Sequence, residues 1–488
     1  MILSSKKQLF LDDHVIAAAN NVRRVIHPAR KHPSNPVLWD GHVYGSVIQD
    51  AGKYRMWYQC GRAVCYAESE DGIRWKKPAL DVCRIEGRNT NVLLARRETA
   101  QQAGRVACSE PGPLFPYFYE LFGVHKDLRD NDPARRYKMG YLSDDRSYSG
   151  PHEDPFHKGQ RRGLGVAASP DGIHWQVVKD WATDAICDGG THWMFDEGRG
   201  KYILYGRTKY IPPEVARAWG LNGLPTVPMS PEWHAFVKET VWGRAVARAE
   251  SADFLQWDVT QGGKAPVVMA DDAQDRPGTE IYALHVFPYE SLFIGLVKVW
   301  HRTPDGGPLD IELAVSHDSV NFTRVGDRTA FIPVGDAGEW DRFNQSVSTN
   351  PPIAVGDELR FYYSGRTARH SPYRGKDTGA IGSGVGIATI PRDRFVSLAA
   401  SFDGGQILTK LLRLSGPRLH LNAKSDFGEI LIEVLDQAGQ MVRRSKPVRT
   451  DSLDITVDWE QSSTSGFEGP VVLRITLKNA HLFAIWSS

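Results

Sequence analysis

A seven-residue pattern that recurs along the chain restricts the possible fold more than any other feature. Residues 69–75 read Ser-Glu-Asp-Gly-Ile-Arg-Trp, residues 169–175 read Ser-Pro-Asp-Gly-Ile-His-Trp, and weaker copies follow at 251–257 and 316–322. Each copy follows a run of small and apolar residues, turns at Asp-Gly or its substitute, and ends on an aromatic. Asp and Gly accept the positive φ and tight geometry of a hairpin turn. The pattern therefore predicts a strand and a turn that are repeated along the chain.

A second element, rich in aromatic and apolar residues, precedes each copy. Such runs, each of one strand's length, lie at 53–58, 136–141, 201–205, 291–296 and 358–363. A fifth copy at 385–395 keeps the strand and the final aromatic but lacks the turn. The units recur at roughly 65 to 100 residues, a spacing that suits a four-stranded blade with long loops. Five units predict an all-β fold with a five-bladed β-propeller.

The repeat stops near residue 400, and short alternating strands follow to the end of the chain. A chain of 488 residues is also longer than one ordinary core should serve. We therefore expect a propeller over residues 1–408 and a small antiparallel β-sandwich, an accessory domain, over 409–488. A first strand at 8–16 is expected to complete the last blade. The loops at 143–163 and 212–241, the second with a short helix at 213–219, are expected to lie at the surface and to wall a pocket.

The composition argues against nucleic-acid binding and against a membrane span, and it bears on the state of the cysteines. A net charge of +1 without a long basic run gives no support to nucleic-acid binding. No apolar run approaches membrane-spanning length, and no signal peptide is visible, so we expect a cytoplasmic protein unless a leader has been removed. The five cysteines lack metal-type spacing and are interpreted as reduced, mostly structural thiols. Cys60 and Cys65 could pair only in an oxidising compartment.

The opening and closing blades resemble a known superfamily. Residues 36–38, 44–47 and 54–58, the Ser-x-Asp-Gly-x-x-Trp turns, and residues 386–389 and 393–398 are similar to the five-bladed glycosidase superfamily that holds glycoside hydrolase families 32 and 43. The resemblance covers nearly the whole chain and implies a propeller that acts on carbohydrate. It does not specify the substrate, because the superfamily spans fructosidases, arabinofuranosidases, xylosidases and phosphorylases. Family 32 also carries Asn-Asp-Pro-Asn-Gly before the first inner strand, where this chain has His42-Val43-Tyr44-Gly45.

Glycoside hydrolysis needs two carboxyl groups across the scissile bond, one of them with a raised pKa. Side chains just before the innermost strands of a propeller converge on its axis, so candidates were sought only at those positions. The candidate substrate-binding residues are His42, Tyr44, His192, Trp193, Tyr282, Arg342, Asn344 and His370. The candidate carboxyl groups are Asp40, Asp188 and Glu280, with Glu110 as a weaker one and Asp341 beside Arg342.

The sequence suggests a role for each of the three main carboxyl groups, and an alternative for two of them. Glu280 enters an apolar strand, where burial would raise its pKa as a general acid requires. Asp188 would activate water or attack directly, and Asp40 would orient the sugar or stabilise its cation. Alternatively, Asp188 and Asp40 are plain turn residues beside glycine. The aspartates of the repeated turn are interpreted as structural because they recur once per blade.

The function predicted from these residues is an exo-acting glycoside hydrolase for oligosaccharides, without a cofactor. No ligand cluster for a metal is visible, although the resemblance to family 43 suggests that an axial histidine could hold a structural cation or water. A glycoside phosphorylase, with Arg342 and His370 on phosphate, is the nearest rival. A non-catalytic sugar-binding propeller is the rival from another class, favoured by the missing family 32 carboxylate, and a protein-interaction scaffold is a third.

Overall fold

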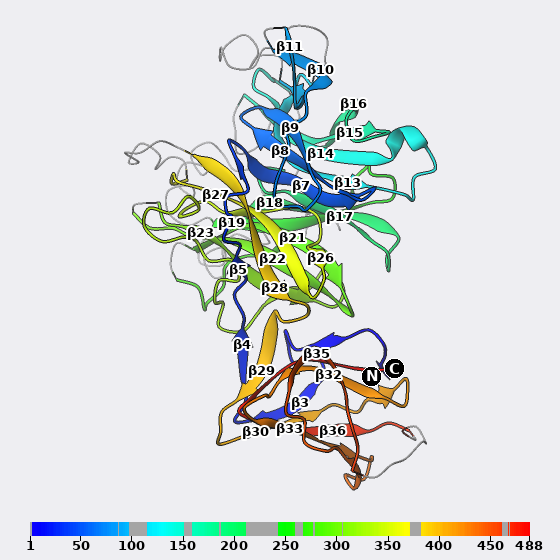
Figure 1. Cartoon of the computed structure of the whole chain (residues 1–488). Coiled ribbons are helices and arrows are strands. Elements are labelled where there is room, and N and C mark those ends of the chain that lie inside the picture. Colours follow the sequence, from blue (N-terminus) through cyan, green and yellow to red (C-terminus); the bar gives the residue numbers. More distant parts are fainter. Residues whose placement is uncertain are drawn as a thin grey trace, which may run out of the picture.

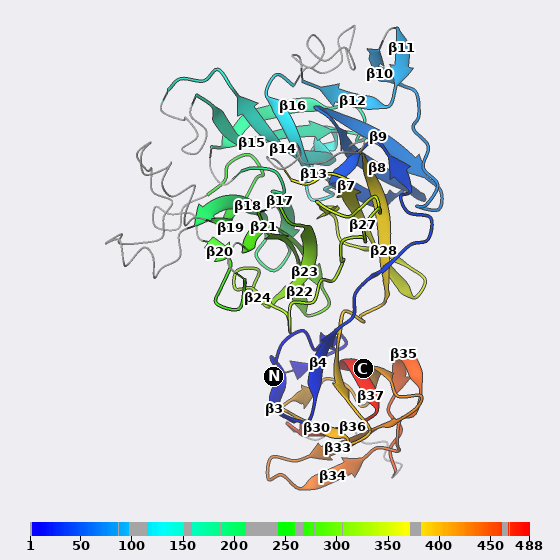
Figure 2. The same cartoon turned by 90° about the vertical axis from the view of Figure 1, so that its left-hand side faces the viewer.

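The computed structural model describes residues 2–85, 87–96, 115–150, 159–184, 187–210, 243–258, 267–276, 279–304, 306–370, 382–460, 467 and 469–488. These residues form two parts, a larger one with the repeated strands and a smaller one that holds both chain termini (Figures 1 and 2). Almost all regular structure is strand; the described helical structure is one 3₁₀ turn, η1 (Pro133–Arg135). The all-β prediction is confirmed. No helix in the described part of the chain has the length and apolar character needed to cross a membrane.

The larger part consists of five blades in chain order, each with its strands antiparallel to their neighbours. Blade one is β7 (His42–Asp50), β8 (Lys53–Cys60), β9 (Ala63–Ser69) and β12 (Val92–Ala95). Blade two is β13 (Phe118–Lys126), β14 (Tyr137–Asp145), β15 (Arg161–Ser169) and β16 (Gln176–Thr183). Blade three is β17 (His192–Asp196), β18 (Lys201–Tyr210), β19 (Gly243–Ser251) and β20 (Val267–Met269).

Blades four and five complete the series. Blade four is β21 (Thr279–Tyr289), β22 (Leu292–His301), β23 (Leu309–Ser316) and β24 (Thr323–Arg324). Blade five is β25 (Ser346–Val347), β26 (Ile353–Val355), β27 (Glu358–Arg366) and β28 (Ser383–Pro391), and its outer edge is completed by β5 (Arg30–Lys31) and β6 (Leu38–Trp39). A small hairpin, β10 (Leu80–Ile85) with β11 (Arg88–Thr90), projects from blade one.

The hydrophobic cores show that the blades close into a ring. One cluster of buried side chains joins blades one and two, and others join two with three, three with four, and four with five. A further cluster packs Met56 of blade one against Tyr362 and Ile387 of blade five. Since blade five therefore contacts both blade four and blade one, the five sheets surround a common axis. This is the propeller that the repeat predicted.

The smaller part is built from two sheets that share one apolar core. The first contains β35 (Asp451–Thr456), β32 (Leu419–Lys424), β37 (Ala480–Ser487), β29 (Val396–Ala400) and β4 (Arg23–Ile26), with β2 (Gln8–Leu9) also on β37. The second contains β3 (Ile16–Asn20), β30 (Gly405–Thr409), β36 (Val472–Lys478), β33 (Glu429–Leu435) and β34 (Met441–Arg444). A short parallel pair, β1 (Ile2–Leu3) with β31 (Arg413–Leu414), lies beside them.

Strand pairing corrects the expected role of the N-terminus. The prediction that residues 8–16 complete the last blade is wrong, because β2 pairs with β37 and β3 pairs with β30. Residues 30–39 complete the blade instead, through β5 and β6 on β28. The strands of residues 2–26 and 396–409 thus pair within the smaller part, although all of these residues except Thr409 fall in the range predicted for the propeller, 1–408.

The cysteines also differ in part from the prediction. Cys60, Cys65 and Cys187 are free thiols, as expected. Cys83 on β10 is disulfide-bonded, so the prediction of five reduced cysteines is wrong at this position.

Candidate active site

A cavity of about 650 Å³ opens where the inner strands of the five blades begin. Every blade contributes to its wall, as the propeller prediction required. The lining residues are His42, Tyr44, Gln59, Gly61, Arg62, Tyr119, Glu120, Arg162, Asp188, Arg207, Arg244, Tyr282, Asn344, Arg366 and His370. Two of these carry carboxyl groups and five carry guanidinium groups, so polar and charged chemistry dominates the cavity.

Glu120, near the start of β13, is the first of the two carboxyl groups. Burial raises its pKa, and the charge of Asp188 raises it further, against the smaller opposing effects of Arg207, Arg366 and Arg62. The carboxyl approaches Gly189 so closely that a side chain at that position would collide with it. Glycine at 189 thus allows blade three to lie directly against Glu120.

Asp188, in the turn before β17, carries the second carboxyl group of the cavity. Burial would raise its pKa, but Arg207 and Arg162 outweigh burial and hold the pKa well below its usual range. Arg207 forms an ion pair with one carboxylate oxygen, and the Arg162 guanidinium lies 3.4 Å from the other. The backbone N–H of Gly189 also donates to the carboxylate at 2.8 Å. Asp188 is therefore held ionised.

The two carboxyl groups differ in the way that acid–base catalysis requires. One cavity holds a carboxyl whose surroundings favour the protonated form and another whose surroundings favour the charged form. Such a divergence between neighbouring groups is the signature by which an acid and its ionised partner are assigned. The cavity can thus offer a proton to a leaving group and a negative charge to a developing cation.

Six residues selected from the sequence line this cavity. They are His42, Tyr44, Asp188, Tyr282, Asn344 and His370. The Tyr282 hydroxyl and the His370 Nε2 atom are 3.0 Å apart, which links blade four to the segment between β27 and β28 of blade five. The ring centroids of His42 and Tyr44 are 4.7 Å apart in an edge-to-face arrangement. These rings provide flat surfaces beside the charged groups.

Two of the proposed carboxyl groups are not among the residues that line the cavity. Glu280 accepts hydrogen bonds from Arg244 on one oxygen and from Arg302, at 3.0 Å, on the other. Both of its oxygens are therefore occupied by guanidinium donors. Asp40 is exposed, with a φ of 65°, and its backbone pairs with Ser383 and Cys60. The alternative interpretation of Asp40 as a turn residue agrees with this geometry.

Three further candidates also lie elsewhere. His192 is 1% exposed and bonds the carbonyl oxygen of Val286 at 2.7 Å, farther along the axis. Trp193 packs on His125 and lines a smaller hollow at the opposite end of the inner strands. Arg342 is exposed beside Phe343. Glu110 and the helix expected at 213–219 lie outside the described residues.

Glu120 was not predicted as a site residue, because Glu110 was the carboxyl group expected in blade two. Its neighbours, Tyr119 and Leu121, continue an ordinary strand, and no turn signal comes directly before it. Its position in the repeat could have indicated it. Blade two needs an inner strand before the aromatic run at 136–141, and Glu120 lies near the start of the apolar segment that forms this strand.

A buried lysine lies close to the cavity wall. The Lys298 ammonium donates to the Asn344 Oδ1 atom at 2.8 Å and to the Ser346 hydroxyl at 2.7 Å. It lies 4.5 Å from the Tyr282 ring centroid. Burial and the nearby guanidinium groups hold its pKa well below the usual value. Lys298 thus fixes Asn344 and Tyr282 in the wall.

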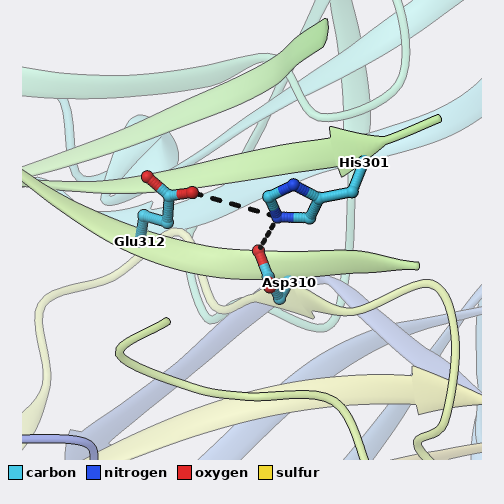
Figure 3. Close-up of side chains that lie close together, drawn as sticks. All are labelled: His301, Asp310 and Glu312. Carbon is cyan, nitrogen blue, oxygen red and sulfur yellow. Dashed lines mark hydrogen bonds and ion pairs between the residues drawn. The ribbon is translucent and has the colours of Figure 1, made fainter. Parts of the chain in front are cut away.

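One group of side chains among the described residues has the composition of a cation site. His301, Asp310 and Glu312 place ligand-type atoms within 4.8 Å of one another (Figure 3). However, Arg324 donates to the Glu312 carboxylate at 2.6 Å, and the His301 ring nitrogen lies 3.0 Å from Asp310. The hydrogen bond with Asp310 raises the pKa of His301. These contacts are those of an ion-pair network on blade four.

No family model and no curated protein matches the sequence. Among solved structures, a glycosyl hydrolase from Bacteroides ovatus is 13% identical over 76% of this chain and 95% of that chain, with a TM-score of 0.41. A family 43 arabinoxylan arabinofuranohydrolase from Bacillus subtilis, in complex with cellotetraose, is 12% identical over 94% and 98%, with a TM-score of 0.36. A family 32 β-fructofuranosidase from Bombyx mori is 10% identical over 96% and 93%, with a TM-score of 0.37. The chain is similar to these glycoside hydrolases at low sequence identity, and its all-β fold rests on its own strand pairing.

Proposed function

We propose that the protein hydrolyses glycosidic bonds of oligosaccharides, with Glu120 as the general acid and Asp188 as the ionised partner. The observation that supports this most strongly is the opposite direction of the two pKa shifts within one cavity. Glu120 would protonate the leaving oxygen, while Asp188 would activate water or stabilise the sugar cation. Tyr44, His42 and Tyr282 would carry the faces of the sugar rings.

This assignment moves the acid from Glu280 to Glu120. Glu280 has guanidinium donors on both oxygens and is not among the lining residues, whereas Glu120 faces the cavity. Glu280 instead orders Arg244, which does line the cavity. A cavity of about 650 Å³ is the size of a small-molecule site, which favours release of a terminal sugar over cleavage within a long polymer.

The test compares leaving groups. Wild type, Glu120→Gln, Asp188→Asn and Glu280→Gln are assayed on oligosaccharides and on aryl glycosides whose phenols range from poor to good leaving groups. Glu120→Gln should lower kcat roughly 10²- to 10⁴-fold on unactivated substrates. It should lower kcat much less on activated aryl glycosides, because a good leaving group needs no proton. Asp188→Asn should lower kcat on both classes. The acid assignment is wrong if Glu280→Gln shows the leaving-group dependence and Glu120→Gln does not.

Two rivals are tested by the same assay. A phosphorylase is favoured by the five guanidinium groups in the cavity, and it would require phosphate for turnover and yield a sugar phosphate. A non-catalytic sugar-binding propeller would bind sugars and release none. It is favoured by blade one, which contributes His42, Tyr44, Gln59, Gly61 and Arg62 to the described lining and no carboxyl group.

A further inference from the structure

The cavity contains more positive charge than its carboxyl groups can neutralise. Arg162 and Arg207 are paired with Asp188, and Arg244 is paired with Glu280. The two remaining guanidinium groups, those of Arg62 and Arg366, form no ion pair with a described residue and line the cavity nonetheless. A cationic side chain facing a cavity without a counter-ion is well placed to receive one from a ligand.

The side chain of Arg62 is held in place by its own blade and its neighbour. Arg62 donates from Nη1 to the Tyr119 carbonyl oxygen at 3.1 Å, and its guanidinium carbon lies 3.4 Å from the centroid of the Tyr119 ring. Stacking on the ring leaves the edge of a guanidinium free to donate bidentate hydrogen bonds. Arg62 is therefore preorganised for a planar anion such as a carboxylate.

Arg366 reaches the same cavity from blade five. It is the last residue of β27, and its guanidinium carbon lies 5.9 Å from the Tyr44 ring centroid. The positive charges of Arg366 and Arg62 both favour the ionised form of Glu120 and so lower its pKa. Arg207 favours the ionised form of Glu120 more strongly than either, but Arg207 is already paired with Asp188. Because Arg62 stacks on Tyr119, the residue before Glu120, the unpaired positive charge lies beside the proposed acid.

The positions of Arg62 and Arg366 relative to the two carboxyl groups indicate which part of a substrate would carry a negative charge. The general acid faces the leaving group, and the ionised partner faces the attacking water. A phosphate ion that replaced water would have to bind on the side of Asp188, where Arg162 and Arg207 are engaged. An anion at Arg62 and Arg366 belongs on the leaving-group side.

We propose that Arg62 and Arg366 bind a carboxylate on the sugar that leaves, so that the substrate is an acidic oligosaccharide containing a uronic acid. The proposal rests on the hydrolase function above, since the side of the cavity is named by the role of Glu120. A neutral sugar at this position would leave two guanidinium groups without their anion and would bind less well.

The test uses binding, so that it does not depend on turnover. Uronate-containing disaccharides and the same disaccharides after reduction of the carboxyl group to a primary alcohol are titrated into the full-length protein by calorimetry. Charge-assisted hydrogen bonds should make the acidic form bind roughly 10- to 100-fold more tightly. Arg62→Gln and Arg366→Gln should each reduce this ratio, while Arg418→Gln, at an exposed position in the smaller part, should preserve it.

Each other outcome overturns the proposal. Equal affinity for the two forms, no binding of either, or a ratio that survives in both arginine variants shows that these side chains do not bind a sugar carboxylate. Inorganic phosphate that binds at these arginines in preference to the disaccharides shows that the anion is a co-substrate instead. Hydrolysis is then measured on the same disaccharides. Selective binding of the acidic form without sugar release refutes the hydrolase function but supports the carboxylate site. Sugar release without selective binding supports the hydrolase function but refutes the carboxylate site.

Discussion

At the level of single residues, function depends on how the surroundings of two carboxyl groups differ. Glu120 and Asp188 line the same cavity, yet burial dominates at one and guanidinium groups dominate at the other. A carboxyl group is neither an acid nor a base by itself, because its protonation at a given pH follows from these competing effects. The environment, set by neighbouring blades, therefore assigns the two roles.

This difference predicts the pH dependence of catalysis. Turnover requires Asp188 ionised, so the rate should rise as the pH increases through its lowered pKa, and it requires Glu120 protonated, so the rate should fall as the pH passes its raised pKa. The profile of kcat/KM on an unactivated oligosaccharide, whose leaving oxygen needs the proton of Glu120, should therefore fall on the alkaline side. In Glu120→Gln the alkaline limb should disappear. If that limb persists in the variant, another group is the acid; thermal melts at each pH control for unfolding.

The sequence could predict part of this site. His42, Tyr44, Asp188, Tyr282 and Asn344 were found because a turn signal precedes each inner strand, and that signal is local. Glu120 was missed because its effect depends on Gly189 and on arginines of other blades, which no spacing along the chain reveals. Glu280 occupies the expected strand start, but ion pairs with Arg244 and Arg302 change what it can do.

At the level of elements, three copies of the repeated turn accept a hydrogen bond from a side chain of a neighbouring blade. In the copy at 169–175, the Asp171 Oδ1 atom accepts from the backbone N–H groups of Ile173 and His174, at 2.8 and 2.9 Å. The Gly172 carbonyl oxygen accepts from the Trp57 indole of blade one at 2.7 Å. Similar bonds join Tyr362 of blade five to Gly72 at 2.9 Å and Tyr205 of blade three to Ser319 at 2.7 Å. The predicted structural role of these aspartates is confirmed, and the turn also joins neighbouring blades.

A pair of glycine variants isolates this contact between blades. Gly172 has a φ of +79°, and a Cβ there would lie 2.7 Å from the Trp57 ring, whereas Gly200 has a φ of +63° and open space around it. Gly200→Ala should cost about 1 kcal/mol of unfolding free energy, because alanine disfavours positive φ. Gly172→Ala should cost about 1–3 kcal/mol more, through overpacking against Trp57. Urea denaturation of both variants measures the difference, and equal losses would show that the Trp57 contact yields without cost.

At the level of the whole molecule, the chain begins and ends in the same part. β4 pairs with β29, and β37 pairs with both β29 and β2. The sequence could not predict this, because strands hundreds of residues apart carry no mutual signal. The internal repeat did predict the ring, since each blade repeats the same local pattern. A local repeat can thus be recognised in the sequence, whereas the pairing of the terminal strands cannot be predicted from it.

This pairing predicts the outcome of a truncation. A chain that ends at residue 408 would lose β32, β33, β36 and β37, which pair with or pack on the strands of residues 2–26 and 396–408. Apolar residues such as Phe10, Ile16 and Ile407 would be left without their core. We expect this truncated chain to aggregate, as judged by soluble yield and size-exclusion chromatography. A soluble monomer that retains the sugar binding of the full chain would show that the propeller needs no support from the C-terminal strands.

Three buried histidines from different blades lie together at the axis of the propeller. His125 of β13, His192 of β17 and His285 of β21 meet there, with ring centroids 6.4 Å apart for the first two and 5.3 Å apart for the last two. Burial lowers the pKa of His192 to about 4 and that of His125 to about 3, and it also lowers the pKa of His285. Three blades therefore meet on imidazoles that are neutral in the folded protein at neutral pH.

These histidines should make the protein sensitive to acid. In the unfolded chain each takes up a proton near its ordinary pKa of 6.5, while in the folded protein protonation is delayed to lower pH. The unfolded state thus binds more protons between about pH 4 and 6.5, so stability should rise with pH across this window. For a histidine such as His192 the loss between pH 7 and pH 5 is about 2 kcal/mol. Urea denaturation at several pH values in this range should show that the unfolding free energy rises less steeply with pH in His192→Gln than in wild type. Because the slope is compared rather than the stability itself, a weakened variant still gives an answer, and an unchanged slope in His192→Gln would exclude the axial histidine as a source of acid sensitivity.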